Sequence, residues 1–149
     1  MNALVDAIAL RCAALLAGQS FDDPSDNTSP VAMQIYKHAI PVATTEAEKQ
    51  EQAPYVVVRV VGIEDQDGKT VFVVRLGVEL FTWSDVEAGY ADLDRLLAAL
   101  RPICQRGPSA MAGYKVLHPT VWQIGNKESG NQPHPFYECF CELRIVGAK

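Results

Sequence analysis

Hydrophobic side chains near the N-terminus recur every three or four residues, the spacing that gathers them on one face of an α-helix. This pattern predicts a helix from about Ala3 to Ala17, with Asn2 as its N-cap and Gly18 as its terminator. The side chains on the apolar face are Leu4, Val5, Ile8, Cys12, Leu15 and Leu16. The opposite face carries only Asp6 and Arg11 among small alanines, so either solvent or a neighbouring subunit covers it.

A second amphipathic stretch predicts a helix over residues 85–101. It opens with Ser84-Asp85-Val86-Glu87, a capping-box spacing in which the Ser84 hydroxyl accepts a hydrogen bond from the first turn and Glu87 reaches back. The side chains expected in the core are Val86, Tyr90, Leu93, Leu97 and Leu100. Arg95 and Arg101 lie late in the helix, where cations suit the negative end of its dipole.

Residues 55–64 and 70–82 are rich in Val, Phe and Ile, and they flank the turn sequence Asp65-Gln66-Asp67-Gly68-Lys69. Asp67-Gly68 supplies the positive φ angles that a two-residue turn needs, so the pattern predicts a long β-hairpin. The core face of the second strand has Phe72, Val74, Leu76, Val78 and Leu80. Arg75 and Glu79 lie on the opposite face, so we expect only part of that face to contact solvent.

Two more strands are predicted near the C-terminus: Tyr114–Ile124, which is either kinked or at a sheet edge at Pro119, and Phe136–Val146. The last strand alternates, with Tyr137, Cys139, Cys141, Leu143 and Ile145 on one face and Glu138, Glu142 and Arg144 on the other. A short strand is expected within Val31–Ile40. The stretches predicted to be loops are polar: Ser20–Pro30, Thr44–Gln52 and Gly125–Pro135.

These elements predict one domain over residues 1–149, of α+β class, with a mainly antiparallel four- to five-stranded sheet and two principal helices packed on one face. The length of 149 residues suits a single hydrophobic core. A composition of 48% hydrophobic and 21% charged residues is typical of a globular protein. Arg59 and Arg75 interrupt the longest apolar runs, so no membrane-spanning helix and no membrane partner are expected.

The net charge and the cysteine content limit which binding partners and which cell compartment are expected. Thirteen Lys and Arg against eighteen Asp and Glu give a net charge of −5, and no basic cluster is present that could neutralise several phosphates, so no specific nucleic-acid binding is expected. The N-terminus lacks the basic region of a secretory signal, which predicts a cytoplasmic protein. The cysteines expected to be reduced thiols are Cys12, Cys104, Cys139 and Cys141.

Two cysteine arrangements were candidates for chemistry. Cys139 and Cys141 could bind Zn²⁺ together with His134 or His118, but the spacing usual for structural zinc is absent and their strand face is apolar. Burial of both thiols in the core is therefore the favoured interpretation. A nucleophilic cysteine is disfavoured because the sequence places neither Cys12 nor Cys104 beside a histidine.

A carboxylate pair and a glycine-containing loop were the other candidates. Glu138 and Glu142 share a strand face and could act as acid and base, but surface charge or ion pairing with Arg144 or Arg75 is commoner. The loop from Gly125 lacks the Gly-Lys-Ser/Thr ending of a phosphate-binding loop. We therefore expect no catalytic residue, no metal ligand, no cofactor and no enzymatic activity.

The order and spacing of elements over roughly Tyr55–Arg101 nevertheless resemble a known family. A Pro54-Tyr55 start leads into a long valine-rich hairpin, whose second strand ends in Phe81-Thr82-Trp83. A Ser/Asp-capped helix follows, with Leu93, Leu96, Leu97 and Leu100. Together with the N-terminal amphipathic helix, this arrangement resembles the tail-terminator family of tailed bacteriophages, with a looser match through the two C-terminal strands.

The resemblance implies a phage or prophage structural protein, an α+β subunit that forms a hexameric ring with copies of itself. Such a ring stops polymerisation of the tail-tube protein and presents a surface to the head–tail connector protein, without catalysis. It implies assembly in the host cytoplasm and then a place in the virion tail. The contact residues expected in the corresponding loops are Asp65, Asp67, Lys69, Lys127 and Glu128. The loop Thr44–Gln52 is a further candidate contact.

Other functions stay open at this point. The acidic segment Ser20–Pro30 departs from the family pattern and leaves the role of that region unassigned. A different neck or tail-completion component would share the fold but bind a different ring. A small-ligand-binding or enzymatic α+β domain would need a pocket lined by the thiols and histidines.

Overall fold

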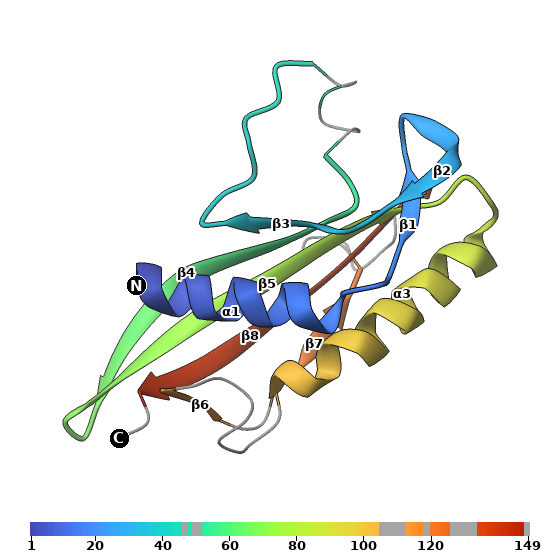
Figure 1. The fold of residues 1–149 in the computed structure, drawn as a ribbon. Helices are drawn as coiled ribbons and strands as arrows, with labels where there is room; N and C mark the ends of the chain where they lie inside the picture. The colour runs from blue at the N-terminus through green and yellow to red at the C-terminus, as the bar shows by residue number, and fades with distance from the viewer. Residues whose placement is uncertain (46–47, 49–51, 105–112, 118–119, 126–133, 148–149) are drawn as a thin grey trace.

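The computed structural model describes residues 1–45, 48, 52–104, 113–117, 120–125 and 134–147. Within them, a six-stranded sheet carries two α-helices on one face, and a two-stranded ribbon lies beside the sheet (Figure 1). The strand order is β3-β4-β5-β8-β6, and β7 also pairs with β8. Only β3 and β4 run parallel among the described pairings, so the predicted α+β class with a mainly antiparallel sheet is confirmed.

The elements follow one another in the predicted order, with additions. In chain order they are α1 (Asn2–Leu15), β1 (Phe21–Asp23), β2 (Asp26–Val31), β3 (Gln34–Lys37), β4 (Tyr55–Gln66), β5 (Lys69–Phe81), α3 (Val86–Leu100), the 3₁₀ helix η1 (Arg101–Cys104), β6 (Tyr114–Leu117), β7 (Trp122–Ile124) and β8 (Phe136–Gly147). The predicted strand Tyr114–Ile124 corresponds to β6 and β7, which pair with different parts of β8. This division raises the strand count of the sheet to six.

The β4–β5 hairpin and β8 form the centre of the sheet. Asp67 and Gly68 have φ angles of 48° and 76°, so the tight turn predicted from Asp-Gly is confirmed. β5 pairs with β8 from Phe72↔Ile145 to Phe81↔Phe136 without a break. The β4–β5 register shifts between Val60 and Gly62, which leaves Val61 as the extra residue of a β-bulge.

One face of the sheet is the core face, as the strand alternation predicted. The buried side chains on it are Val56, Val58, Val74, Leu76, Val78, Leu80, Tyr137, Cys139, Cys141, Leu143 and Ile145. Apolar side chains of both helices belong to the same cluster: Leu4, Val5, Ile8, Cys12, Leu93, Leu96, Leu97 and Leu100. Each large aliphatic side chain removed from water contributes about 1.5–3 kcal/mol, so this layer accounts for the docking of the helices.

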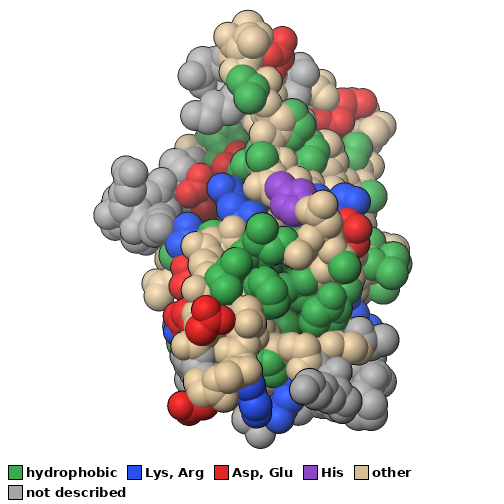
Figure 2. All heavy atoms as spheres, turned by 90° about the vertical axis from the view of Figure 1, so that its left-hand side faces the viewer, with side chains coloured by type: hydrophobic (Ala, Val, Ile, Leu, Met, Phe, Trp, Pro, Cys, Tyr) green, Lys and Arg blue, Asp and Glu red, His purple; other side chains and the backbone are tan. Residues whose placement is uncertain are grey.

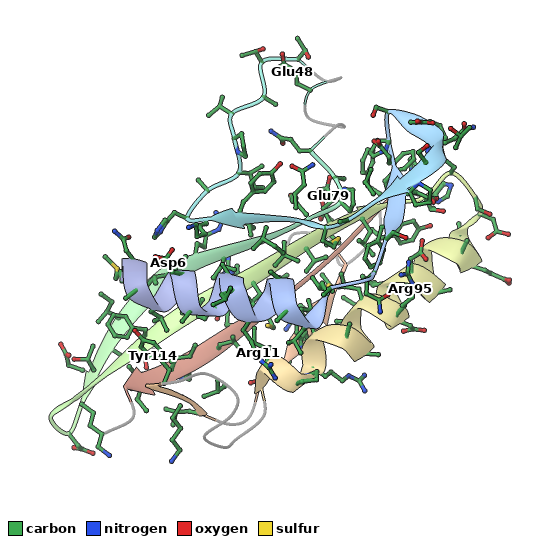
Figure 3. The ribbon with its side chains drawn as sticks, in the orientation of Figure 1. Asp6, Arg11, Glu48, Glu79, Arg95 and Tyr114 are labelled. Carbon is green, nitrogen blue, oxygen red and sulfur yellow. The ribbon has the colours of Figure 1, made fainter. Side chains whose placement is uncertain are left out.

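α1 lies across the β3–β4 side of the core face (Figure 1). Asp6 points from α1 toward β3 (Figure 3), where its Oδ1 is 3.1 Å from Lys37 Nζ. The prediction of Asn2 as N-cap is wrong: Asn2 is the first helical residue, and Met1 precedes it without a side-chain capping bond. Gly18 has a φ of 79°, the left-handed conformation that glycine adopts at low cost as the chain leaves the helix.

α3 packs on β5 and β8. Its N-cap is Asp85, whose Oδ1 accepts from the Ala88 backbone N–H at 2.9 Å, so the prediction of a Ser84 cap is wrong by one residue. Gly89 is buried against Tyr137: a Cβ placed there would lie 2.3 Å from the buried ring. The absence of a side chain at Gly89 therefore allows α3 to approach β8 closely.

The segment Ser20–Pro30, predicted to be a loop, contains the ribbon β1–β2, and that prediction is wrong. The two strands pair from Phe21↔Val31 to Asp23↔Asp26, around a two-residue turn at Pro24-Ser25. Asp23 Oδ1 accepts from both the backbone N–H and the hydroxyl of Ser25, at 2.9 and 2.8 Å. Local polar bonds of the kind expected in a loop thus stabilise the turn of a short hairpin.

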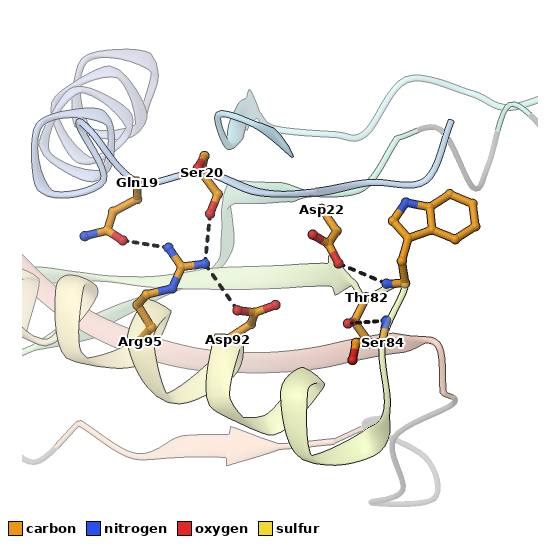
Figure 4. A network of polar contacts seen from close by, with 8 residues as sticks. Gln19, Ser20, Asp22, Thr82, Ser84, Asp92 and Arg95 are labelled. Atoms are coloured by element: carbon orange, nitrogen blue, oxygen red, sulfur yellow. Dashed lines mark hydrogen bonds and ion pairs between the residues drawn. The ribbon is translucent and has the colours of Figure 1, made fainter. Parts of the chain in front are cut away.

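Tertiary contacts hold this ribbon against α3 (Figure 4). Arg95 donates to Gln19 Oε1 and to the Ser20 carbonyl, both at 2.8 Å, and its guanidinium lies 4.2 Å from the centre of the Phe21 ring. At the other end, the Trp83 indole N–H donates to the Asp23 carbonyl at 2.7 Å. The Trp83 backbone N–H also donates to Asp22 Oδ2, at 2.9 Å.

Candidate functional site

Three of the five residues expected to make assembly contacts lie together at the tip of the β4–β5 hairpin. Asp65, Asp67 and Lys69 are all exposed, and the Thr70 hydroxyl donates to Asp65 Oδ1 at 3.2 Å. Lys127 and Glu128 are outside the described residues, as is most of the loop Gly125–Pro135.

The polar segment 44–52 is described only at residues 44, 45, 48 and 52. Glu48 Oε2 accepts from the backbone N–H of Thr44 at 2.8 Å and from its hydroxyl at 2.7 Å. These bonds stabilise the ionised carboxylate, and the backbone bond is the larger cause of a lowered Glu48 pKa. The described residues of this segment do not bring it to the hairpin tip.

β4 extends well beyond its outer neighbour and leaves a sheet edge. β3 pairs only with Tyr55–Val58, so within the described residues the side of Arg59–Gln66 away from β5 has no strand beside it. Val61 and Ile63 on this stretch are 42% and 53% exposed. We call Val61, Ile63, Asp65, Asp67 and Lys69 the hairpin surface. Figure 2 views the molecule from the side where the hairpin tip lies, and apolar side chains gather near the middle of this face, above the level of the tip.

A groove lies at the opposite edge of the sheet, beyond β8, between α3 and β7. It has a volume of about 310 Å³ and is lined by Tyr90, Leu93, Asp94, Leu97, Arg101, Trp122 and Ile124. We call these residues the α3–β7 groove. Its walls include exposed apolar surface, because Tyr90 and Ile124 are each 44% exposed. Val86 and Val121, outside the lining, are 50% and 60% exposed.

The prediction that Val86 and Tyr90 are buried in the core is therefore wrong. The buried positions of α3 are Gly89, Leu93, Leu96, Leu97 and Leu100. The Tyr90 ring packs edge-on against Tyr137, with ring centroids 5.5 Å apart, and its outer side faces the groove. The apolar stripe of α3 thus continues past the core onto the surface.

The sheet face away from the helices carries ordered charge pairs. Arg75 donates to Glu142 Oε1 at 2.6 Å, and its guanidinium lies 5.3 Å from the centre of the Phe140 ring. Arg144 pairs with Glu64 across the sheet. Of the alternatives left open for Glu142, ion pairing with Arg75 is the one that the structure shows.

This face also holds a shallow hollow of about 200 Å³, below the roughly 300 Å³ usual for small-molecule sites. Tyr55 and Glu79 lie on its wall, and their side-chain oxygens are 3.5 Å apart. Burial, and then the negative charges of Glu79 and Glu138, raise the pKa of the Tyr55 hydroxyl. Glu138 and Glu142 are four residues apart on the strand, about 13 Å, which is too far for a carboxylate pair.

Three of the cysteines occupy the core. Cys12, Cys139 and Cys141 are buried and form no disulfide, so the predicted burial of the last two is confirmed. Burial raises the pKa of Cys12 and of Cys139 from 9.0 to about 12, which disfavours the thiolate that nucleophilic attack or metal binding requires. Of the other candidate ligands, His118 and the side chain of Cys104 lie outside the described residues.

His134, the remaining candidate zinc ligand, is exposed, and its Nδ1 lies 2.7 Å from the Tyr137 hydroxyl. Within the described part of the chain, no three His, Cys, Asp or Glu side chains are grouped as metal ligands would be. No helix in that part is both long enough and apolar enough to cross a membrane.

Comparison with known proteins gives no relative: neither a protein-family model nor a curated protein matches the chain.

The α3–β7 groove was missed by sequence reasoning, because periodicity assigns every apolar residue of a stripe to the core. The one sequence signal for it was Tyr90, which continues the apolar stripe toward the start of α3.

Proposed function

We propose that this chain is a structural subunit of a bacteriophage or prophage tail, which forms a homo-oligomeric ring, with six copies expected, and closes the end of the tail tube. The ring would present its other side to the head–tail connector. The proposal joins the resemblance of residues 55–101 to tail terminators with the surfaces described above. No enzymatic step and no cofactor enters it.

The observation that carries the proposal is the pair of dissimilar exposed apolar surfaces. The hairpin surface ends in charged side chains on a sheet edge, whereas the α3–β7 groove is concave and is lined mainly by aliphatic and aromatic side chains. Contiguous apolar surface that stays exposed in one subunit marks sites of protein association. Two different patches on one chain favour a head-to-tail contact, which closes into a ring when the rotation between subunits allows it.

The position of the two surfaces also supports a ring. Ile124 pairs with Cys139, and Cys139 pairs with Val78. Val78 lies nine residues from Lys69 along β5, a separation of about 30 Å. A subunit with separated, dissimilar surfaces contacts one neighbour through each of them.

The test measures mass and shape of the purified chain. Multi-angle light scattering would be run on the chain alone and after mixing with tail tubes from the same phage or prophage, followed by negative-stain microscopy. We expect a particle of about six times the 16.3 kDa subunit mass, or rings at tube ends if assembly requires the tube. A chain that stays monomeric in solution and absent from tube ends would overturn the proposal.

A further inference from the structure

We infer that the hollow on the sheet face away from the helices binds a small organic monocarboxylate, with its negative charge at Arg59 and Arg75 and its apolar chain over Gly77. The inference goes beyond the proposed function and does not depend on it. It follows from the strand register, from two guanidinium donors that have no acceptor, and from the local balance of charge.

The strand register builds the hollow from three rows of residues that cross β4, β5 and β8. The core-facing neighbours of these residues are buried under the helices, so the rows themselves lie on the opposite face of the sheet. The rows are Arg59–Arg75–Glu142, Val57–Gly77–Phe140 and Tyr55–Glu79–Glu138. All of these residues except Glu142 line the hollow. An apolar strip therefore lies between two charged rows.

Gly77 is at the centre of the three rows and leaves room above the sheet. A Cβ at this position would lie 3.2 Å from Cγ1 of Val57 and would fill part of the hollow. Phe140 is the neighbour of Gly77 on β8, so a chain over Gly77 contacts aliphatic and aromatic surface. The volume of about 200 Å³ admits only a short chain.

The two arginines at one end of the hollow supply the donors. Arg59 and Arg75 are directly opposite each other on β4 and β5, an arrangement that like charges disfavour. Their Nε–H groups are both buried, and neither has a hydrogen-bond partner within the described residues. Because buried donors are nearly always paired, two such donors beside one hollow indicate a place for an acceptor.

The charge balance specifies an acceptor with a single negative charge. Arg75 pairs with Glu142 at 2.6 Å, whereas Arg59 belongs to none of the salt bridges of the described residues. One positive charge of this row is therefore uncompensated. A carboxylate matches that charge and accepts two parallel N–H bonds from a guanidinium. Glu79 and Glu138 make the other end of the hollow negative, so the carboxylate binds only at the arginine end.

Titration of the whole chain with sodium hexanoate at neutral pH, followed by ¹H–¹⁵N NMR, tests the site. We expect saturable shifts of the Gly77 and Phe140 backbone amides, because the apolar chain of the probe would lie against both residues. Hexan-1-ol lacks the negative charge and hexylammonium reverses it. Each should therefore bind at least about tenfold more weakly than hexanoate.

Three variants connect the binding to the named residues. Arg59→Gln removes the uncompensated charge and should weaken hexanoate binding at least about tenfold. Arg144→Gln is the matched control and should bind hexanoate like the parent, because Arg144 pairs with Glu64 on the same face and does not line the hollow. Gly77→Ala places a methyl group in the hollow and should also weaken binding. Thermal melting shows whether each variant folds, and Arg59→Gln alone decides the result if Gly77→Ala does not.

The outcomes separate this site from the proposed function. Saturable binding that Arg59→Gln loses and Arg144→Gln keeps supports the inference. The absence of saturable shifts, equal binding by the parent and Arg59→Gln, or equal binding of hexan-1-ol and hexanoate would each overturn it. Ring formation and binding at tube ends are measured independently, so failure of this site leaves the tail function standing, and failure of the ring leaves the site standing.

Discussion

Gly89→Ala is the substitution for which the structure gives the sharpest expectation. The added Cβ would lie 2.3 Å from Cε2 and Cζ of Tyr137 and 2.8 Å from its Cδ2. Ordinary contact at such a position begins at 3.4 Å, so the helix and the ring must separate by about 1 Å. The Tyr137 ring is fully buried and lies within the core cluster, so it has little room to move.

Two opposing effects set the magnitude. Overpacking of a close-packed core costs about 1–3 kcal/mol, and a clash with a buried ring belongs at the upper end. Alanine inside a helix is favoured over glycine by about 1 kcal/mol. The expected net loss is about 2 kcal/mol, or a fall in Tm of about 4–8 °C for a chain of this size.

Urea unfolding followed by circular dichroism would measure this loss. Ala91→Gly, at an exposed position of the same helix, calibrates the propensity effect and should cost about 1 kcal/mol. In a Tyr137→Leu background the ring is gone, so Gly89→Ala should become neutral or stabilising. If Gly89→Ala stabilises the parent protein by about 1 kcal/mol, the close approach of α3 to β8 is wrong.

Three further predictions concern stability and thiol chemistry. Asp85→Ala removes the observed N-cap and should lower the unfolding free energy measured in urea by about 1 kcal/mol. Ser84→Ala should leave it nearly unchanged. If Ser84→Ala destabilises the protein more than Asp85→Ala does, Ser84 is the N-cap and this assignment is wrong. Arg95→Met loses the contact with the Phe21 ring and the hydrogen bonds to Gln19 and Ser20, so the unfolding free energy should fall by about 1–2 kcal/mol. A fall of less than about 0.3 kcal/mol would contradict the anchoring of β1–β2 by Arg95. Because burial raises the pKa of Cys12 and Cys139 to about 12 in the folded state, their stabilising contribution is complete below pH 9 and is lost as the pH rises toward 12. These two thiols should resist a thiol reagent at pH 8 until urea unfolds the chain, all four cysteines should then titrate, and elemental analysis should find no zinc.

Most of the fold could be predicted because local pattern and tertiary position agree over its longest elements. The alternation of β5 and β8 assigned every core side chain of those strands to the correct face, since both strands lie at the centre of the sheet. The hairpin turn followed from Asp67-Gly68, whose positive φ angles only a few residue types tolerate. Such signals are contained within a dozen residues.

The missed features depend on contacts between distant residues. β2 is exposed along most of its length, so its sequence has no apolar alternation, and it pairs with β1 in a ribbon that Arg95 and Trp83 hold from 60 to 76 residues away. The parallel pairing of β3 with β4 likewise joins segments that have no local signal for one another. Of the candidate surfaces, the hairpin tip could be predicted from its turn chemistry. The groove could not, because its aromatic walls come from α3 and β7 and meet only in the folded chain.

The most direct measurement of the central claim asks whether the chain stops growth of a tail tube. Tubes from the same phage or prophage would be incubated with the purified chain, then given fresh tube protein, and their lengths measured by negative-stain microscopy. If the chain is a ring-forming terminator, tubes that carry a ring at the growing end should keep their length while untreated tubes elongate. If treated and untreated tubes elongate equally, or the chain binds along tube walls rather than at one end, the proposed function is wrong.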